Sequence, residues 1–381
     1  MSIGQRRAAV ASRGVAAESR AVAFARRAIG WLALGGLLVC TAGCSADYVA
    51  RAVFEEARIL WRREPIEKLL EQPSLADATK RKLQLVLDVR EFASARIGLR
   101  VGGSYSAIST VDGRAVVQLL TASRRDRLEP YTWWFPVVGR VPYKGFFSKT
   151  SATATAADIQ RQGYDTYVRP AIAFSTLGWF DDPLPSPLLK HDEITLAQVI
   201  FHELLHNTVF LPGETAFDES TATFVGYRGA IEFFCEGQRS VSDPCGAATA
   251  DWQDTLTISR FFTKILADLE AFYATKPKGP ALDQGREQAF AEIREKFKAL
   301  KLHPGRYADF AAGPINNATL LQERIYLRDL DVFDEIYREE GSLRATVETI
   351  RRAVGRGGDP FDRVREALVA SRTRIARSQR R

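Results

Sequence analysis

Residues 195–206, TLAQVIFHELLH, contain the pattern H-E-x-x-H. Apolar residues recur through this stretch at helical spacing, which predicts a helix with one buried face. We expect Thr195 to cap its N-terminus. Positions i and i+4 of a helix project from one face, so the imidazoles of His202 and His206 can reach a single ion. Glu203, beside the first histidine, is placed to act on a water bound to that ion.

A two-histidine site needs a third protein ligand and an open position for water. A second helix is expected after the Pro212-Gly213 turn, and small side chains following Glu219 would let it pack closely on the first. We therefore expect Glu219 to be the third ligand. The alternative acids are Asp218, which more naturally caps the helix, and Glu214 in the connecting turn. Because the chain has only four histidines, chance rarely produces this pattern, although two buried structural histidines are the other interpretation.

Length and charge narrow the class of protein. The chain has 381 residues, 46% hydrophobic and 26% charged, which is typical of a globular protein. Its formal net charge is +7, but residues 1–45 hold six arginines against one acid. Five more arginines lie in the last eleven residues. The body is therefore close to neutral, and we expect no nucleic-acid partner.

The N-terminus has the pattern of a secretion signal. An Arg- and Ala-rich start precedes the apolar run 28–42, which is too short to span a membrane comfortably. Thr41-Ala42-Gly43-Cys44 resembles the bacterial lipobox, which implies cleavage before Cys44 and a lipid on that residue. Ser45 favours sorting to the outer membrane, with the body facing the periplasm. The alternative is an uncleaved membrane anchor.

Two cysteines remain in the body, Cys235 and Cys245. They are ten residues apart and flank a stretch rich in Gly, Ser, Asp and Pro, so in an oxidising periplasm they would close a small disulfide loop. A thiolate metal pair is the alternative, but such pairs usually lie two to four residues apart.

The rest of the chain predicts an α+β fold of two lobes, with the site in the cleft between them. Pro65 is expected to break or kink a first helix at 46–70, which a second helix at 74–99 follows. The tail from Ser371 is expected to be frayed. Breaks in the helical part are expected near 237–247, 276–285, 303–314 and 355–360. The expected units are the signal peptide 1–43, N-terminal helices 44–100, a strand-rich lobe 101–190 with a mainly antiparallel sheet, a helical metal-binding lobe 191–352, and a short helix with a basic tail 353–381.

Several blocks resemble the bacterial putative-aminopeptidase lipoprotein family, and H-E-x-x-H followed by a helix with E-x-x-A resembles the gluzincin zinc peptidases. The blocks are the lipobox, 136–145 (PVVGRVPYKG), 175–183 (STLGWFDDP), the metal helix and 217–219 (FDE). The match runs from about Cys44 to Arg352, with Asp218 where the family usually has Asn. The resemblance implies a thermolysin-like core, one Zn²⁺ on the three ligands, peptide substrates and aminopeptidase activity.

The expected mechanism needs three kinds of protein group. Glu203 takes a proton from the attacking water and passes it to the leaving amine. A further donor stabilises the oxyanion, and Tyr326 is the first choice because it follows Asn316-Asn317-Ala318 in a helical stretch that the family shares. The candidate donors are Tyr143, Tyr164, Tyr167, Tyr227 and Tyr326. The resemblance also suggests that an edge strand at 173–180 pairs with the substrate, although an ordinary core strand is equally compatible.

Exopeptidase action further requires an acid that holds the substrate α-amine. Many aminopeptidases of the gluzincin clan use a Gly-x-Met-Glu-Asn strand, which is absent here because Met1 is the only methionine. The possible substitutes are Asp181, Asp182, Glu193 and Glu214. Two other functions therefore stay open: a zinc endopeptidase acting on envelope or cell-wall peptides, and a non-catalytic lipid-anchored protein with a structural zinc.

Overall fold

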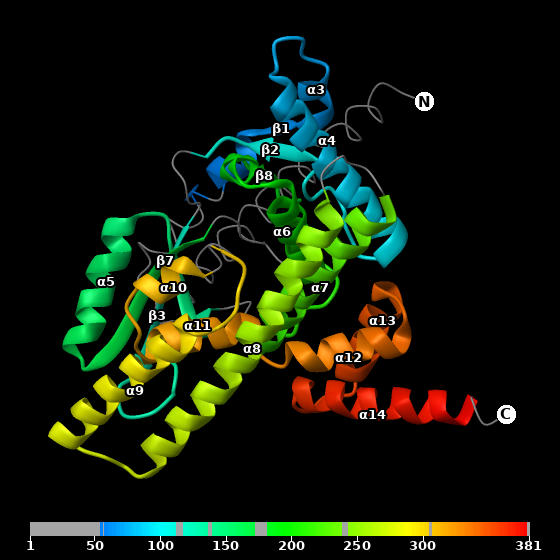
Figure 1. Cartoon of the computed structure of the whole chain (residues 1–381). Coiled ribbons are helices and arrows are strands. Elements are labelled where there is room, and N and C mark those ends of the chain that lie inside the picture. Colours follow the sequence, from blue (N-terminus) through cyan, green and yellow to red (C-terminus); the bar gives the residue numbers. More distant parts are fainter. Residues whose placement is uncertain are drawn as a thin grey trace, which may run out of the picture.

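A computed structural model describes residues 54–55, 57–111, 117–135, 139–171, 181–237, 243–304 and 307–378. Helices dominate the α+β architecture, and three small sheets lie beside them (Figure 1). The signal peptide, Cys44 and the strand expected at 173–180 lie outside the described residues. Within the described ranges, no helix is both long enough and apolar enough to cross a membrane.

The first helix expected at 46–70 is interrupted at Pro65, as predicted for that proline, but the interruption is a short strand. Residues 57–61 are helical, but β1 (Arg63–Pro65) interrupts the chain before α3 (Ile66–Leu70). β1 pairs antiparallel with β2 (Ala107–Ser109), which pairs parallel with β8 (Leu184–Pro185). Pro65 explains the break, because proline lacks an N–H and holds the residue before it in an extended conformation.

The second expected helix is present as two consecutive segments. α4 (Asp77–Phe92) continues into a π-helical turn, η1 (Ala93–Ile97), which ends at Gly98. Gly98 has φ +85°, a left-handed conformation that glycine adopts readily at a helix C-terminus. The side chains of Leu83, Val86 and Val89 are buried in the main core.

The central sheet has the order β6-β3-β7, with antiparallel pairing throughout. β3 (Val117–Arg124) lies between β6 (Tyr143–Phe146) and β7 (Tyr164–Ala171). A separate ribbon joins β4 (Trp133–Phe135) to β5 (Gly139–Val141). The expected mainly antiparallel pairing is thus confirmed, since among the described strands only β2 with β8 is parallel, but the strands form three small sheets instead of one.

A helix that the sequence reading missed covers the central sheet. α5 (Lys149–Arg161) connects β6 to β7 and lies against β3 and β7, on the side away from α7 and α8 (Figure 1). Ala152, Ala156 and Ile159 face the sheet and pack with Leu120 in a small second core. Interspersed threonines, which favour strands, obscured this helical period.

The remainder is helical, and most of its breaks coincide with Gly- or Pro-containing stretches. The elements are η2 (Ser186–Lys190), α6 (Glu193–His206), α7 (Thr215–Gly237), α8 (Pro244–Ala274), α9 (Pro280–Lys298), α10 (Ala308–Ala312), α11 (Asn317–Leu327), α12 (Leu330–Glu340), α13 (Leu343–Val354) and α14 (Pro360–Ser378). Cys235 and Cys245 form a disulfide between α7 and α8. The tail expected to be frayed from Ser371 is instead helical to Ser378, because Ser371 is buried and donates a hydrogen bond to Glu340 at 2.8 Å.

The main core forms around α6, α7 and α8, with α6 near the centre of the molecule (Figure 1). A glycine lets α6 and α7 approach closely. A Cβ at Gly226 would lie 2.7 Å from the carbonyl oxygen of Gln198 and 3.3 Å from Cβ of His202. The glycine therefore fixes how near the α7 backbone comes to the H-E-x-x-H helix.

Candidate metal centre

Helix α6 presents the two histidines on one face. Its N-cap is Asp192 rather than the expected Thr195: the Thr195 backbone N–H donates to Asp192 Oδ1 at 2.8 Å. The helix thus begins three residues earlier than expected, at Glu193. The H-E-x-x-H spacing places the rings of His202 and His206 with centroids 5.1 Å apart.

Helix α7 supplies the third acidic group. It begins at Thr215, so Glu219 lies in its second turn. The carboxylate of Asp218 instead accepts a hydrogen bond from the Leu211 backbone N–H at 2.9 Å and holds the turn before the helix. Glu214 provides the carbonyl that accepts the Asp218 backbone N–H at the helix start. Neither alternative acid joins the histidines.

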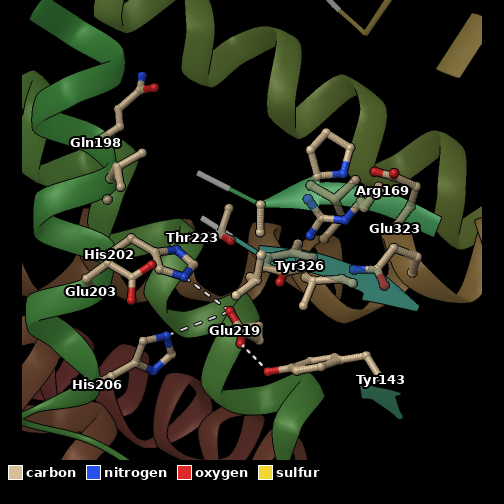
Figure 2. A pocket seen from close by; sticks show the side chains of 18 of the residues that line it. Tyr143, Arg169, Gln198, His202, Glu203, His206, Glu219, Thr223, Glu323 and Tyr326 are labelled. Atoms are coloured by element: carbon tan, nitrogen blue, oxygen red, sulfur yellow. Dashed lines mark hydrogen bonds and ion pairs between the residues drawn. The ribbon is translucent and has the colours of Figure 1, made fainter. Parts of the chain in front are cut away.

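Glu219 lies between the two imidazoles. Its Oε2 is 3.1 Å from His202 Nε2 and 3.7 Å from His206 Nε2 (Figure 2). One potential ligand atom from each of the three side chains falls within a group no wider than 4.8 Å. All three side chains are largely shielded from solvent, with exposures of 17%, 6% and 12% for His202, His206 and Glu219.

The three groups match the requirements of zinc. Two imidazole nitrogens and one carboxylate oxygen are a donor set typical of catalytic zinc sites, which keep a fourth position open. Ligand atoms about 2.1 Å from a tetrahedral ion lie about 3.4 Å from one another. The observed separations of 3.1 and 3.7 Å bracket that value. The three side chains could therefore hold a metal after closing around the ion, because their potential ligand atoms already lie within 4.8 Å of one another.

Burial and the neighbouring charges shift the pKa values in this cluster. Burial alone would lower the pKa of His206, but the hydrogen bond and charge of Glu219 raise it to about 9. Burial would raise the pKa of Glu219, yet the two histidines hold it well below the usual value. The carboxylate thus stays ionised and draws a cation to the site.

Glu203 lies next to His202 in the chain but is not one of the three potential metal ligands. Burial raises the pKa of its carboxyl group, and the adjacent histidines lower it by a smaller amount. A carboxyl group with a raised pKa suits a general base that must later release its proton.

A cavity of about 730 Å³ opens onto the metal group. It lies between the β6-β3-β7 sheet and helices α6, α7 and α11, and most of its other lining is apolar. Of the five candidate tyrosines, Tyr143, Tyr227 and Tyr326 line the cavity, whereas Tyr164 and Tyr167 do not. The size and the apolar walls suit a small organic ligand or a short peptide segment.

The two nearest tyrosines play different parts. The Tyr143 hydroxyl donates to Glu219 Oε1 at 3.1 Å. The Tyr326 ring stacks on His202, with centroids 6.2 Å apart and planes 27° from parallel. Among the described residues, no hydrogen bond uses the Tyr326 hydroxyl, which leaves it available to a bound molecule.

Residues 47–356 match a family model whose description is "Putative aminopeptidase". The chain belongs to this putative aminopeptidase family. Searches of curated proteins and of solved structures returned no match. The name of the family suggests a peptidase, so the chemistry of the site is compared with that of a peptidase.

An aminopeptidase needs a group for the substrate amine, and the acids proposed from sequence do not supply one. Asp181, Asp182, Glu193 and Glu214 are all absent from the cavity lining. Asp181 instead accepts a hydrogen bond from the Gly103 backbone N–H at 2.7 Å. None of the four possible substitutes therefore lines the cavity.

The cavity contains two charged groups that the sequence reading missed, Arg169 of β7 and Glu323 of α11. Glu323 precedes Tyr326 by three residues and thus shares its helix face, which was a usable signal. Arg169 gave no comparable signal, because its place in the cavity depends on strand pairing between distant segments.

Proposed function

We propose that this protein is a zinc-dependent peptidase that acts as an aminopeptidase. The observation that carries the proposal is the cluster of His202, His206 and Glu219 beside the non-ligand acid Glu203, on one wall of a cavity. A purely structural zinc site has no need for a free carboxyl group beside its ligand. Membership of the putative aminopeptidase family supports the choice of peptide bonds as the target.

When bound, one Zn²⁺ would polarise the scissile carbonyl and acidify a coordinated water. Glu203 accepts the proton of the attacking water and donates it to the leaving amine. Burial raises the pKa of the Tyr326 phenol, so this group remains protonated and able to donate. Its hydroxyl is therefore the proposed donor to the developing oxyanion.

The decisive experiment combines metal analysis with peptide cleavage. The purified protein should contain about one zinc per chain, which His202→Ala and Glu219→Ala should both lose. Glu203→Gln should retain the zinc but lower kcat/KM by about 10²- to 10⁴-fold. Full activity of Glu203→Gln, or a folded wild-type protein that binds no divalent metal, would contradict the proposal.

The same assay separates the two peptidase alternatives. An aminopeptidase should lose activity when the substrate N-terminus is acetylated, because its cleavage position is set by the free amine. An endopeptidase should cleave acetylated and free peptides alike. Retained zinc without cleavage of any peptide would favour the structural-zinc alternative.

We propose further that the protein is a lipoprotein anchored to the outer membrane through Cys44. The support is the lipobox-like Thr41-Ala42-Gly43-Cys44 after an apolar run. Cells fed radiolabelled palmitate should label the wild-type protein, and Cys44→Ala should remove both the label and the protein's presence in the membrane fraction. Labelling that persists in Cys44→Ala would overturn the assignment.

A further inference from the structure

Two charged side chains line the cavity in addition to the metal group and Glu203. They are Arg169 of β7 and Glu323 of α11. Figure 2 shows both on the wall opposite Gln198, with Tyr326 near Arg169 on the side of the metal group. The mechanism above gives neither of them a role.

The guanidinium of Arg169 is held in place from two sides. Its Cζ lies 5.1 Å from the centroid of the Tyr326 ring, which in turn stacks on His202. In one orientation of the Gln322 amide, both its nitrogen and its oxygen have hydrogen-bond partners. The nitrogen donates to Thr121 Oγ1, and the oxygen accepts from Arg169 Nε at 3.3 Å and from Arg169 Nη2 at 3.1 Å. A guanidinium fixed in this way loses little entropy when it binds a ligand.

Arg169 retains donors for a ligand. A guanidinium has five N–H groups, and the Gln322 amide accepts from two of them. In the part of the chain that the structure describes, no other hydrogen bond uses the remaining three. Glu323 acts on Arg169 through its charge alone, without a hydrogen bond to it among these residues. Arginine with unused N–H groups at a cavity wall is suited to bidentate recognition of a carboxylate.

The position of Arg169 limits which carboxylate it can reach. The ring centroids of His202 and Tyr326 are 6.2 Å apart, and Cζ of Arg169 lies 5.1 Å from the Tyr326 centroid. An extended peptide advances about 3.3–3.6 Å per residue. A peptide whose scissile carbonyl lies at the metal group would therefore bring a carboxylate to Arg169 within a few residues of the cleaved bond.

We propose that Arg169 binds the free C-terminal carboxylate of the substrate, so that the cavity selects short peptides, chiefly di- and tripeptides. This inference rests on the peptidase function proposed above. A longer peptide would present only a neutral main-chain carbonyl at this point, which forms a weaker hydrogen bond with a guanidinium than a carboxylate does.

Glu323 competes with the substrate for the charge of Arg169. Burial raises the pKa of Glu323 to about 7, although Arg169 lowers it in part. An ionised Glu323 repels an incoming carboxylate, so its replacement by a neutral isostere should improve binding. Arg169 and Glu323 should thus affect the same ligand in opposite directions, which a general loss of structure would not produce.

The test measures binding rather than turnover. Zinc-loaded Glu203→Gln protein is titrated by calorimetry with Leu-Ala-Ala and with its C-terminal amide. The free acid should bind about 10-fold or more tightly than the amide, as expected for a charge-assisted hydrogen bond. Adding Arg169→Gln should abolish this difference with little effect on the amide. Arg169→Lys should restore part of it, and Glu323→Gln should strengthen binding of the acid alone.

Equal binding of acid and amide, or an equal loss of both in Arg169→Gln, would overturn the inference. A second outcome would also overturn it: Glu323→Gln binds both peptides more weakly, and N-acetylation of the peptides weakens their binding to the same extent. Glu323 would then hold the substrate amine. Circular dichroism and zinc content show whether each variant is folded. Failure of the proposed function would be seen separately, because zinc-loaded wild-type protein would then cleave neither peptide. The titration would still show whether Arg169 binds the carboxylate.

Discussion

At the scale of single residues, Tyr143 is tied to the metal group without being a ligand. Its hydroxyl donates to Oε1 of Glu219, while Oε2 of the same carboxylate faces both histidines. The hydrogen bond therefore fixes which oxygen is offered to a metal. Groups that orient a ligand in this manner contribute to metal affinity although they never touch the ion.

Tyr143→Phe should raise the dissociation constant for zinc by about 10- to 100-fold, because Glu219 loses its orienting donor. Competition with a chromophoric chelator measures this constant. Tyr164→Phe is the matched control, since that hydroxyl lies 3.4 Å from Arg124 and outside the cavity lining. Unchanged affinity in Tyr143→Phe would show that the carboxylate is positioned by other contacts.

The His206–Glu219 pair predicts how stability changes with pH in the metal-free protein. The pKa of His206 is raised from 6.5 to about 9, because Glu219 outweighs the effect of burial. Between these values the folded state holds a proton that the unfolded state releases, so stability falls as pH rises. Burial raises the pKa of Asp218 to about 8, which acts in the same direction. The lowered pKa of Glu219 affects the pH dependence of stability only in the acid range, below the ordinary pKa of 4.5.

Melting temperatures of EDTA-treated protein should therefore decrease from pH 6.5 to pH 9. His206→Gln should flatten the decrease, and saturating zinc should remove the His206 part of it because metal replaces the proton. A slope of the same size in His206→Gln would assign the effect to other groups.

Residue spacing explains which parts of the site the sequence could predict. His202 and His206 are related by one helical turn, and Glu219 follows after a short turn, so local rules place all three. Tyr143 and Arg169 reach the same cavity only through pairing of β6 and β7 with β3. No spacing along the chain encodes these contacts, so the sequence identified Tyr143 only as one tyrosine of five and missed Arg169.

At the scale of elements, the approach of α6 to α7 depends on Gly226. Alanine normally favours a helix over glycine by about 1 kcal/mol, but here its Cβ would meet the Gln198 carbonyl at 2.7 Å. We expect Gly226→Ala to lower the free energy of unfolding by about 1–3 kcal/mol and to weaken zinc binding. Chemical denaturation and chelator competition measure the two effects.

Gly355→Ala is the control for this prediction. Gly355 has right-handed helical geometry at the end of α13, and its nearest neighbour for a Cβ is the Arg351 carbonyl oxygen at 3.5 Å, an ordinary contact. This variant should be neutral or slightly stabilised. If Gly226→Ala behaved in the same way, the two helices would have room to separate without loss of the site.

Two elements that the sequence did not predict, helix α5 and strand β1, depend on tertiary contacts. Prolines and glycines correctly marked the break between α7 and α8, the break between α8 and α9, and the end of α13, because these residues act through the local backbone. Helix α5 and strand β1 depend on what they pack against: α5 covers a sheet, and β1 pairs with β2. Such tertiary contacts override weak local preferences, and a single sequence does not display them.

At the scale of the whole molecule, a buried polar network joins the sheet to the helical part. Asp165 Oδ2 of β7 accepts from Arg286 Nη2 of α9 at 2.6 Å and from the Asn317 backbone N–H of α11 at 3.1 Å. Arg286 also donates to the Tyr273 hydroxyl of α8 at 2.9 Å. The cavity lies between these same parts, so we expect the network to set the distance between Arg169 on the sheet and Tyr326 on α11.

Asp165→Ala should therefore damage stability and the site together. Arg286 is 5% exposed, and loss of its carboxylate partner would leave a buried charge uncompensated, which typically costs about 3–5 kcal/mol. Denaturant unfolding measures this loss, and calorimetry with a tripeptide measures the effect on binding. Asp158→Ala is the control, because its ion pair with Arg161 on α5 is solvent-exposed and should contribute little. Similar small effects in both variants would mean that apolar packing alone holds the sheet against α11, and the distance between Arg169 and Tyr326 would then be set by the core.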